Sequence, residues 1–182
     1  MDEDNAASLY RDDAGWTIHR KRAWTVLFSG AHYDYIDFSI TAGQESGTEE
    51  SRQKLRTWMK HLSTFFHSLD FIHSKPLRAG LQMESKDLVE SVLELPEDER
   101  VIYLADGREL IEEQAGQPIA TTLRIALPAG DYRVLLYSPV SGLYSPVQRV
   151  ESQGHIHLPL PAFEQDLVVR IQKDKMQKPI DK

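Results

Sequence analysis

The sequence contains no cysteine and no long hydrophobic run. A chain of 182 residues without cysteine has no disulfide bond, thiolate zinc site, iron–sulfur cluster or cysteine nucleophile. The absence of cysteine does not indicate the cellular compartment, because both cytosolic and exported proteins can lack cysteine. No stretch approaches the roughly 18 consecutive apolar residues that a transmembrane helix needs, so we expect no membrane partner. The acidic start, Met1–Asn5, has no apolar segment and predicts no secretory signal.

Basic residues are fewer than acidic residues in this sequence. Lys and Arg number 21 against 28 Asp and Glu, which gives a net charge of −7. A general nucleic-acid binder presents a basic face, so we expect no nucleic-acid partner, whereas a neutral ligand such as a sugar is compatible with this balance. Hydrophobic residues at 41% and charged residues at 27% are typical of a folded globular chain.

The strongest periodic segment runs from Thr48 to Ile72 and predicts a long amphipathic helix. Its apolar residues recur every three or four positions, as they do along one stripe of an α-helix. Thr48 is suited to cap the N-terminus, and Glu49 and Glu50 lie in the first turn, where the helix dipole favours negative charge. The stripe comprises Leu55, Trp58, Met59, Leu62, Phe65, Phe66, Leu69 and Ile72.

Two further elements are expected before this helix. Residues 15–29 predict another helix, with the basic run Arg20–Arg22 facing solvent and with Trp24, Leu27 and Phe28 inside. His32–Ile40 alternates in polarity and is rich in aromatic residues, which predicts a strand. A lone strand has unpaired edges and is not stable by itself, so we expect that its partners belong to a segment upstream.

Beyond residue 80 the hydrophobic period changes to two, which predicts strands. Short runs separated by turn signals about every 8–12 residues are typical of an antiparallel β-sandwich. The predicted strands are Leu88–Leu95, Arg100–Ala105, Thr121–Leu127, Tyr132–Tyr137, Leu143–Val150, His155–Leu160 and Leu167–Gln172. The expected fold is therefore α+β. A terminal helix–strand–helix segment at 1–78 precedes a sandwich at 79–175, which is followed by a charged tail at 176–182.

Two groups of polar residues have both a functional and a structural interpretation. The acidic run Asp2–Asn5 is either a solvated leader or a set of carboxylates at a strand end, suited to glycoside chemistry. The second group either lines the sugar-binding rim of a barrel, where the active sites of such barrels lie, or fills a core and caps loops. Its members are Tyr33, Asp34, Tyr35, Asp37 and Ser39.

The histidines do not predict a metal site. His155 and His157 form an HxH pair that a strand would place on one face, but no third ligand follows at a diagnostic spacing, and there is no HExxH motif. We expect surface histidines there, with no metal and no cofactor. His61 and His67 fall on the polar flank of the long helix and are expected in solvent. The sequence has no GxSxG, P-loop or GxGxxG motif, so serine-hydrolase and nucleotide-binding functions have no motif support.

Several motifs follow one another in a specific order. Arg20–Gly30, Tyr33–Ser39 and Phe65–Ile72, with Pro76 after them, resemble the last helix–strand–helix of a (β/α)8 glycoside hydrolase barrel. Leu127–Gly142 resembles the LPAGxYxxxWxDPxTG hairpin in the β-sandwich that follows the barrel in the apiosidase-like and collagenase-type glycosidases. That sandwich is classed in the family as a collagen-binding domain. The order of these motifs is more specific than any one of them.

This resemblance implies a carbohydrate ligand and a candidate nucleophile. Glu3 falls where the family nucleophile follows the seventh barrel strand. The residues that would line the substrate site with it are Asp2, Asp4, Asn5, Tyr33, Asp34, Tyr35 and Asp37. Retaining glycosidases need two carboxyl groups about 5–5.5 Å apart, and the acid/base residue of the fourth strand is absent from this sequence. The resemblance therefore implies a glycosidase fragment that is inactive alone, with Met1 as an internal methionine of a protein whose relatives are often exported.

Two other functions and an oligomeric state are also compatible with the sequence. The chain could be a free-standing carbohydrate-binding or adhesion module, or an interaction domain without a ligand. With most of a barrel absent, part of the long helix's stripe and the strand at 32–40 would lack cover. Exposing several large apolar side chains, at about 1.5–3 kcal/mol each, would cost a sizeable part of a domain's stability. We therefore expect a homo-oligomer formed through the N-terminal helices and strand.

Overall fold

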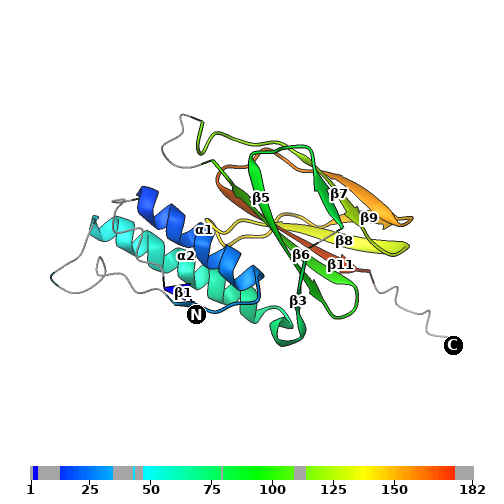
Figure 1. Cartoon of the computed structure of the whole chain (residues 1–182), viewed down its shortest axis with the longest axis horizontal. Helices are drawn as coiled ribbons and strands as arrows, with labels where there is room; N and C mark the ends of the chain where they lie inside the picture. Colours follow the sequence, from blue (N-terminus) through cyan, green and yellow to red (C-terminus); the bar gives the residue numbers. More distant parts are fainter. Residues whose placement is uncertain are drawn as a thin grey trace.

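The computed structural model describes residues 2–3, 13–34, 43, 47–78, 80–108 and 114–174. Its strands are mostly antiparallel and two helices lie against them, so the fold is α+β, as the sequence predicts (Figure 1). The helices are α1 (Asp13–Phe28), α2 (Glu49–His67) and the short 3-10 helix η3 (Phe71–His73). The strands are β1 (Asp2–Glu3), β2 (Tyr33–Asp34), β3 (Lys75–Leu77), β4 (Leu81–Met83), β5 (Leu88–Leu95), β6 (Glu99–Asp106), β7 (Thr122–Ala126), β8 (Gly130–Tyr137), β9 (Gln148–Ser152), β10 (His155–Pro159) and β11 (Asp166–Lys173).

Helix α2 begins where the sequence predicts and ends earlier. A capping box closes its N-terminus: the hydroxyl of Thr48 accepts from the Ser51 N–H at 3.1 Å, and the hydroxyl of Ser51 accepts from the Thr48 N–H at 3.0 Å. The helix stops at His67, so the prediction that it reaches Ile72 was wrong. Ile72 lies in η3 and is 91% exposed.

Helix α1 spans the predicted segment, but one residue that was predicted to face solvent is buried. Trp24 and Phe28 are buried, as expected, and Arg22 is exposed. Arg20 is only 1% exposed, so its predicted place in solvent was wrong. An arginine can be buried at tolerable cost when a carboxylate compensates its charge, and Asp166 supplies that carboxylate.

The sandwich consists of two antiparallel sheets. The larger sheet has the order β3-β5-β6-β11-β8-β9, and the smaller has the order β10-β7-β4. Alternate residues of both sheets meet between them, including Ile102 and Leu104 of β6 and Leu123 and Ile125 of β7. Tyr132 of β8 is fully buried in the same core.

Helices α1 and α2 cover the opposite face of the larger sheet (Figure 1). Tyr103 and Tyr137 point from this face into an aromatic cluster with Trp24, Phe28 and Phe65. Both tyrosines are at most 3% exposed. The larger sheet is therefore buried on both faces, and the helices, the larger sheet and the smaller sheet form three layers.

Most predicted strands of the second half are present within one or two residues of their expected bounds. The exception is Leu143–Val150, because strand pairing starts only at Gln148 and Pro146 cannot donate to a ladder. Strands β3 and β4 were not predicted. Strand β3 contains Pro76, which is tolerated because β3 is an edge strand, and β4 has only three residues.

The apolar stripe of α2 is covered within the single chain. Leu55, Trp58, Leu62 and Phe65 are at most 7% exposed, since the stripe packs against α1 and the larger sheet. The expectation that part of this stripe lacks cover was therefore wrong for these residues. The homo-oligomer itself stays a prediction, because one chain does not test it. Of the helices in the described ranges, none is long and apolar enough to cross a membrane.

Candidate functional site

The structure brings together two segments of the predicted site. Strands β1 and β2 pair in parallel, with Asp2 opposite Tyr33 and Glu3 opposite Asp34. Helix α1 connects them, so this segment is the strand–helix–strand unit from which parallel sheets and barrels are built. The other predicted site residues lie outside the described part of the chain, and they are Asp4, Asn5, Tyr35 and Asp37.

This backbone arrangement places acidic positions on neighbouring strands. Glu3 and Asp34 are register partners, and Asp2 precedes Glu3 on β1. Glycoside hydrolysis uses one carboxyl group as the acid/base and a second one as the nucleophile or as the base that activates water. Two adjacent strands that both carry carboxylates are therefore compatible with part of such a site.

Tyr33 holds strand β2 against helix α1. Its hydroxyl lies 3.0 Å from Nδ1 of His19, and the side chain of His19 is fully buried. The ring of His19 stacks on that of Trp16 with the ring centroids 6.2 Å apart. This hydrogen bond fixes the position of β2 relative to the helix that precedes it. No sequence pattern indicated this role of His19.

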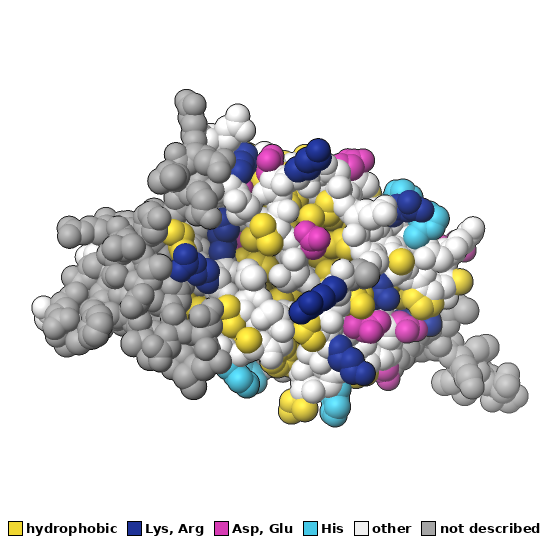
Figure 2. All heavy atoms as spheres, in the orientation of Figure 1, with side chains coloured by type: hydrophobic (Ala, Val, Ile, Leu, Met, Phe, Trp, Pro, Cys, Tyr) yellow, Lys and Arg dark blue, Asp and Glu magenta, His cyan; other side chains and the backbone are white. Residues whose placement is uncertain are grey.

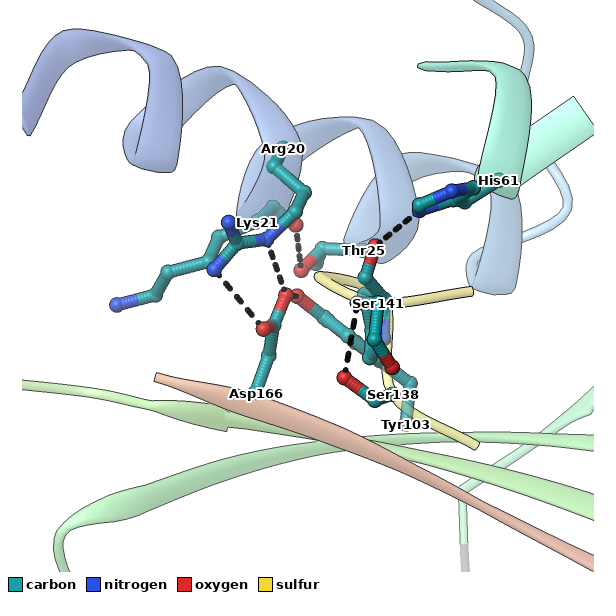
Figure 3. A network of polar contacts seen from close by, with 9 residues as sticks. Arg20, Lys21, Thr25, His61, Tyr103, Ser138, Ser141 and Asp166 are labelled. Atoms are coloured by element: carbon teal, nitrogen blue, oxygen red, sulfur yellow. Dashed lines mark hydrogen bonds and ion pairs between the residues drawn. The ribbon is translucent and has the colours of Figure 1, made fainter. Parts of the chain in front are cut away.

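A buried ion pair fixes α1 on the larger sheet (Figure 3). The Nε and Nη2 atoms of Arg20 donate to the two carboxylate oxygens of Asp166 at 2.9 and 3.0 Å. The hydroxyl of Tyr103 donates to the same carboxylate at 3.2 Å. Burial raises the pKa of Tyr103 well above its ordinary value, and the negative charge of Asp166 adds to the rise. The phenol therefore keeps its proton and acts as a donor.

Arg20 also contacts the second helix. Its guanidinium carbon lies 4.1 Å from the ring centroid of Trp58 in α2, a cation–π arrangement in a site without solvent. Arg20 thereby connects α1, α2 and β11 at one point. Because α1 lies between β1 and β2 in the order of the elements, the same contacts help to position these strands relative to the sandwich.

The histidines differ in part from their predicted places. His67 is exposed, whereas His61 is half-buried: its Nδ1 donates to the carbonyl of Pro139 at 3.1 Å, so its predicted place in solvent was wrong. His155 and His157 are exposed on β10, with their ring centroids 5.2 Å apart. Within the described ranges, no three His, Asp or Glu side chains form a group that could hold a metal ion.

Comparisons with known proteins give structural neighbours only. No family model and no curated protein matches the chain. A glycoside hydrolase family 5 protein from Bacteroides vulgatus ATCC 8482 is similar over 87% of this chain, with a TM-score of 0.54 and 13% identity. A second structure, described as a glycoside hydrolase, is similar over 87%, with a TM-score of 0.53 and 15% identity. Alpha-L-fucosidase isoenzyme 2 from Paenibacillus thiaminolyticus matches 53% of this chain and 16% of its own, with a TM-score of 0.41 and 16% identity.

The two neighbours with the larger overlap support a glycosidase-like fold. A match over 87% of the chain has to include helices as well as the sandwich, because strands β3 to β11 span little more than half of the residues. The chain spans 36% of the length of each of these two structures. At such low identity the likeness concerns the fold alone.

Proposed function

We propose that this chain is the C-terminal part of a glycoside hydrolase. Residues 1–78 form the end of a (β/α)8 barrel, and the sandwich supports that end. The observation that carries the proposal is the parallel β1–α1–β2 unit, followed by α2 and packed on a sandwich. Two structural neighbours that cover 87% of the chain are described as glycoside hydrolases, which adds support.

Glu3 is the nucleophile in this proposal. Its carboxylate attacks the anomeric carbon, and a glycosyl ester forms as the glycosidic C–O bond breaks. A carboxylic acid from an earlier barrel strand protonates the leaving oxygen, and the same group then takes a proton from the water that hydrolyses the ester. Asp2, Asp34 and the other acidic and aromatic positions of the two strands bind the sugar. The isolated chain lacks the acid/base group and has no turnover.

The sandwich is non-catalytic and keeps the last barrel helices in place. The Arg20–Asp166 pair and the aromatic cluster around Trp24 are the contacts that perform this role. Within the glycosidases, the hairpin at Leu127–Gly142 favours the apiosidase-like and collagenase-type enzymes, and its sequence is the basis of that narrower assignment.

The test uses the natural polypeptide that carries residues 1–182, isolated with an antibody raised against this chain. We expect its mass to exceed 20.8 kDa, the mass of the 182 residues, and we expect it to hydrolyse at least one aryl glycoside. Glu3→Ala should lower kcat by about three orders of magnitude or more. Added azide should restore turnover of this variant, because a small anion can occupy the space of the lost carboxylate and attack in its place.

Azide rescue separates a nucleophile from a residue that only supports the fold. Asp70→Ala is the control, because Asp70 is exposed and pairs only with the exposed His73 among the residues with described contacts. It should leave kcat unchanged. An active natural polypeptide in which Glu3→Ala retains full turnover would contradict the assignment of Glu3. A natural polypeptide of 182 residues without turnover would favour a binding or adhesion module instead.

A further inference from the structure

A groove runs along α2 beside the loop that follows β8. It has a volume of about 580 Å³, within the usual range for ligand sites. The helix contributes Gln53, Arg56, Thr57, Lys60, His61 and Thr64, and the loop contributes Ser141, Gly142 and Leu143. The helical positions form one stripe from 53 to 64, about 16 Å long at 1.5 Å per residue. The groove is therefore elongated, and polar side chains line most of it.

The wall of this groove is fixed by hydrogen bonds (Figure 3). His61 donates to the Pro139 carbonyl at 3.1 Å, and the Tyr137 hydroxyl donates to the His61 carbonyl at 3.1 Å. Inside the loop, the Ser141 N–H donates to the Ser138 hydroxyl at 3.2 Å. Loop and helix thus hold each other in one arrangement, so a ligand would meet a preformed surface.

Gly142 is required for this close approach. Its φ is +71°, a conformation that favours glycine, and a Cβ at this position would lie 2.6 Å from Cδ2 of the His61 ring. A larger residue would have to displace the His61 ring or push the loop away from α2. The loop sequence is therefore matched to the helix that it contacts.

The charge in the groove has one sign. Arg56 and Lys60 are exposed, and neither forms an ion pair with any residue of the described ranges. No acidic side chain is among the residues that line the groove. On the face shown in Figure 2 the two signs are mixed, because Lys and Arg lie among Asp and Glu. In a chain of net charge −7, this surface is locally cationic.

We infer that this groove binds an anionic polysaccharide, one that carries carboxylate or sulfate groups. Arg56 and Lys60 bind the anionic groups, and the hydroxyl and amide groups of Thr57, Thr64 and Gln53 bind sugar hydroxyls. Leu143, 68% exposed at the groove, contacts the apolar face of a sugar ring. A single-stranded nucleic acid is less suitable, because its bases need exposed aromatic platforms. Of Phe, Tyr and Trp, only Tyr137 is among the residues that line the groove, and it is 3% exposed.

The assignment of the ligand as a glycan rests on the proposed function. The negative charge of the ligand and the position of its binding site rest on the groove alone. The experiment is affinity electrophoresis of the purified 182-residue chain through gels that contain polygalacturonate, dextran sulfate or neutral dextran, at low ionic strength. Polygalacturonate and dextran sulfate distinguish carboxylate from sulfate recognition. We expect retardation by at least one of them and none by neutral dextran. The double variant Arg56→Gln/Lys60→Gln should bind at least about tenfold more weakly.

The matched control is Lys75→Gln/Lys86→Gln, which removes the same charge from two exposed lysines outside the groove. It should bind within about twofold of the original chain. Leu143→Ser keeps the charge and should weaken binding to the same polysaccharide.

Equal losses in the two double variants would overturn the inference, because the effect would then come from net charge. Absence of retardation in a chain whose circular dichroism is that of a folded protein would also overturn it. A charge-matched oligothymidylate that binds more tightly than either polysaccharide would contradict the ligand class. None of these outcomes depends on turnover by the natural polypeptide, so the proposed glycosidase function stands or fails separately.

Discussion

Arg20 of α1 and Asp166 of β11 form a two-point ion pair across the boundary between the helices and the sandwich. The side chains are 1% and 0% exposed, and the residues are 146 positions apart in the chain. Burying two charges costs several kcal/mol per ion, and good geometry with additional hydrogen bonds has to offset that cost. Tyr103 supplies such a bond, and Trp58 lies against the guanidinium. The pair therefore fixes one arrangement of the two layers.

Removing one partner of this pair should destabilise the chain strongly. Arg20→Met leaves the carboxylate of Asp166 buried without a compensating charge, and we expect a loss of about 3–5 kcal/mol in the free energy of unfolding. Arg20→Met/Asp166→Asn should be more stable than Arg20→Met, because asparagine carries no charge and still accepts from Tyr103. Urea unfolding followed by circular dichroism measures both values.

The control for this pair is Arg149→Met. Arg149 is paired with Asp174 at 3.6 Å, but its side chain is 81% exposed. Exposed pairs contribute about 0–1 kcal/mol, so the substitution should change stability by no more than that. Equal losses of stability in Arg20→Met and Arg149→Met would show that the buried ion pair contributes no more to stability than an exposed one.

The aromatic cluster under the helices should make helices and sandwich unfold together. Trp24 is fully buried, and its ring contacts those of Phe65 and Tyr103, with centroids 5.1 and 5.6 Å away. Trp24→Ala should lower the free energy of unfolding by about 3–5 kcal/mol. The urea concentration at the midpoint of unfolding should fall equally whether it is followed by near-UV or by far-UV circular dichroism. Ile72→Ala, at a 91% exposed position, should have almost no effect. Separate transitions for the two signals would contradict a single cooperative unit.

The N-terminal cap of α2 offers a local test. Thr48→Ala removes the hydroxyl that accepts from the Ser51 N–H, and we expect a loss of about 1 kcal/mol in the free energy of unfolding. Thr57→Ala is the matched control in the interior of the same helix. There the hydroxyl only bonds to the Gln53 carbonyl on an exposed face, and alanine is the better helix former. The control should therefore be as stable as the original chain or slightly more stable.

Asp106 should make stability depend on pH in the acid range. Burial acts to raise the pKa of its carboxyl, but hydrogen bonds from the Arg108 side chain and from the Gly116 and Arg108 N–H groups, together with the Arg108 charge, lower it. The ionised form is thus favoured in the folded state. This stabilisation is present above the unfolded pKa of about 3.9 and is lost as pH falls through the folded pKa.

The expected result is a pH-dependent difference between the original chain and Asp106→Asn. The variant should be less stable at pH 7, and the difference should shrink as pH falls below about 4. Chemical denaturation at several pH values between 7 and 3 measures it. A difference that stays constant over this range would mean that ionisation of Asp106 does not contribute.

Local patterns predicted most of the secondary structure. The stripe from Leu55 to Phe66 and the cap at Thr48 identified α2, and alternation identified strands such as β5 and β8. The local sequence patterns gave a wrong prediction where a tertiary contact determined the secondary structure. Residues 143–147 were predicted to begin a strand, yet they belong to the loop that contacts α2 at His61. Strand β4 is too short to show any period.

Arg20 shows both a missed signal and a limit of sequence reasoning. It lies four positions after Trp16 and four before Trp24, so helical periodicity places it on the buried stripe of α1. Its charge and its basic neighbours led to the opposite prediction. Its partner, Asp166, lies so far along the chain that no local pattern could identify the pair. At the candidate site, the pairing of Glu3 with Asp34 likewise depends on how two distant strands meet.

The most direct test of the proposed function is to trap the glycosyl ester. The natural polypeptide is incubated with an activated 2-deoxy-2-fluoro glycoside, which slows hydrolysis of the intermediate, and is then digested and mapped by mass spectrometry. Our account predicts one added sugar per chain, attached to the peptide that contains Glu3, and no label on the isolated 182-residue chain. A label on a different carboxylate, or a catalytically active polypeptide that never acquires a label, would contradict the account.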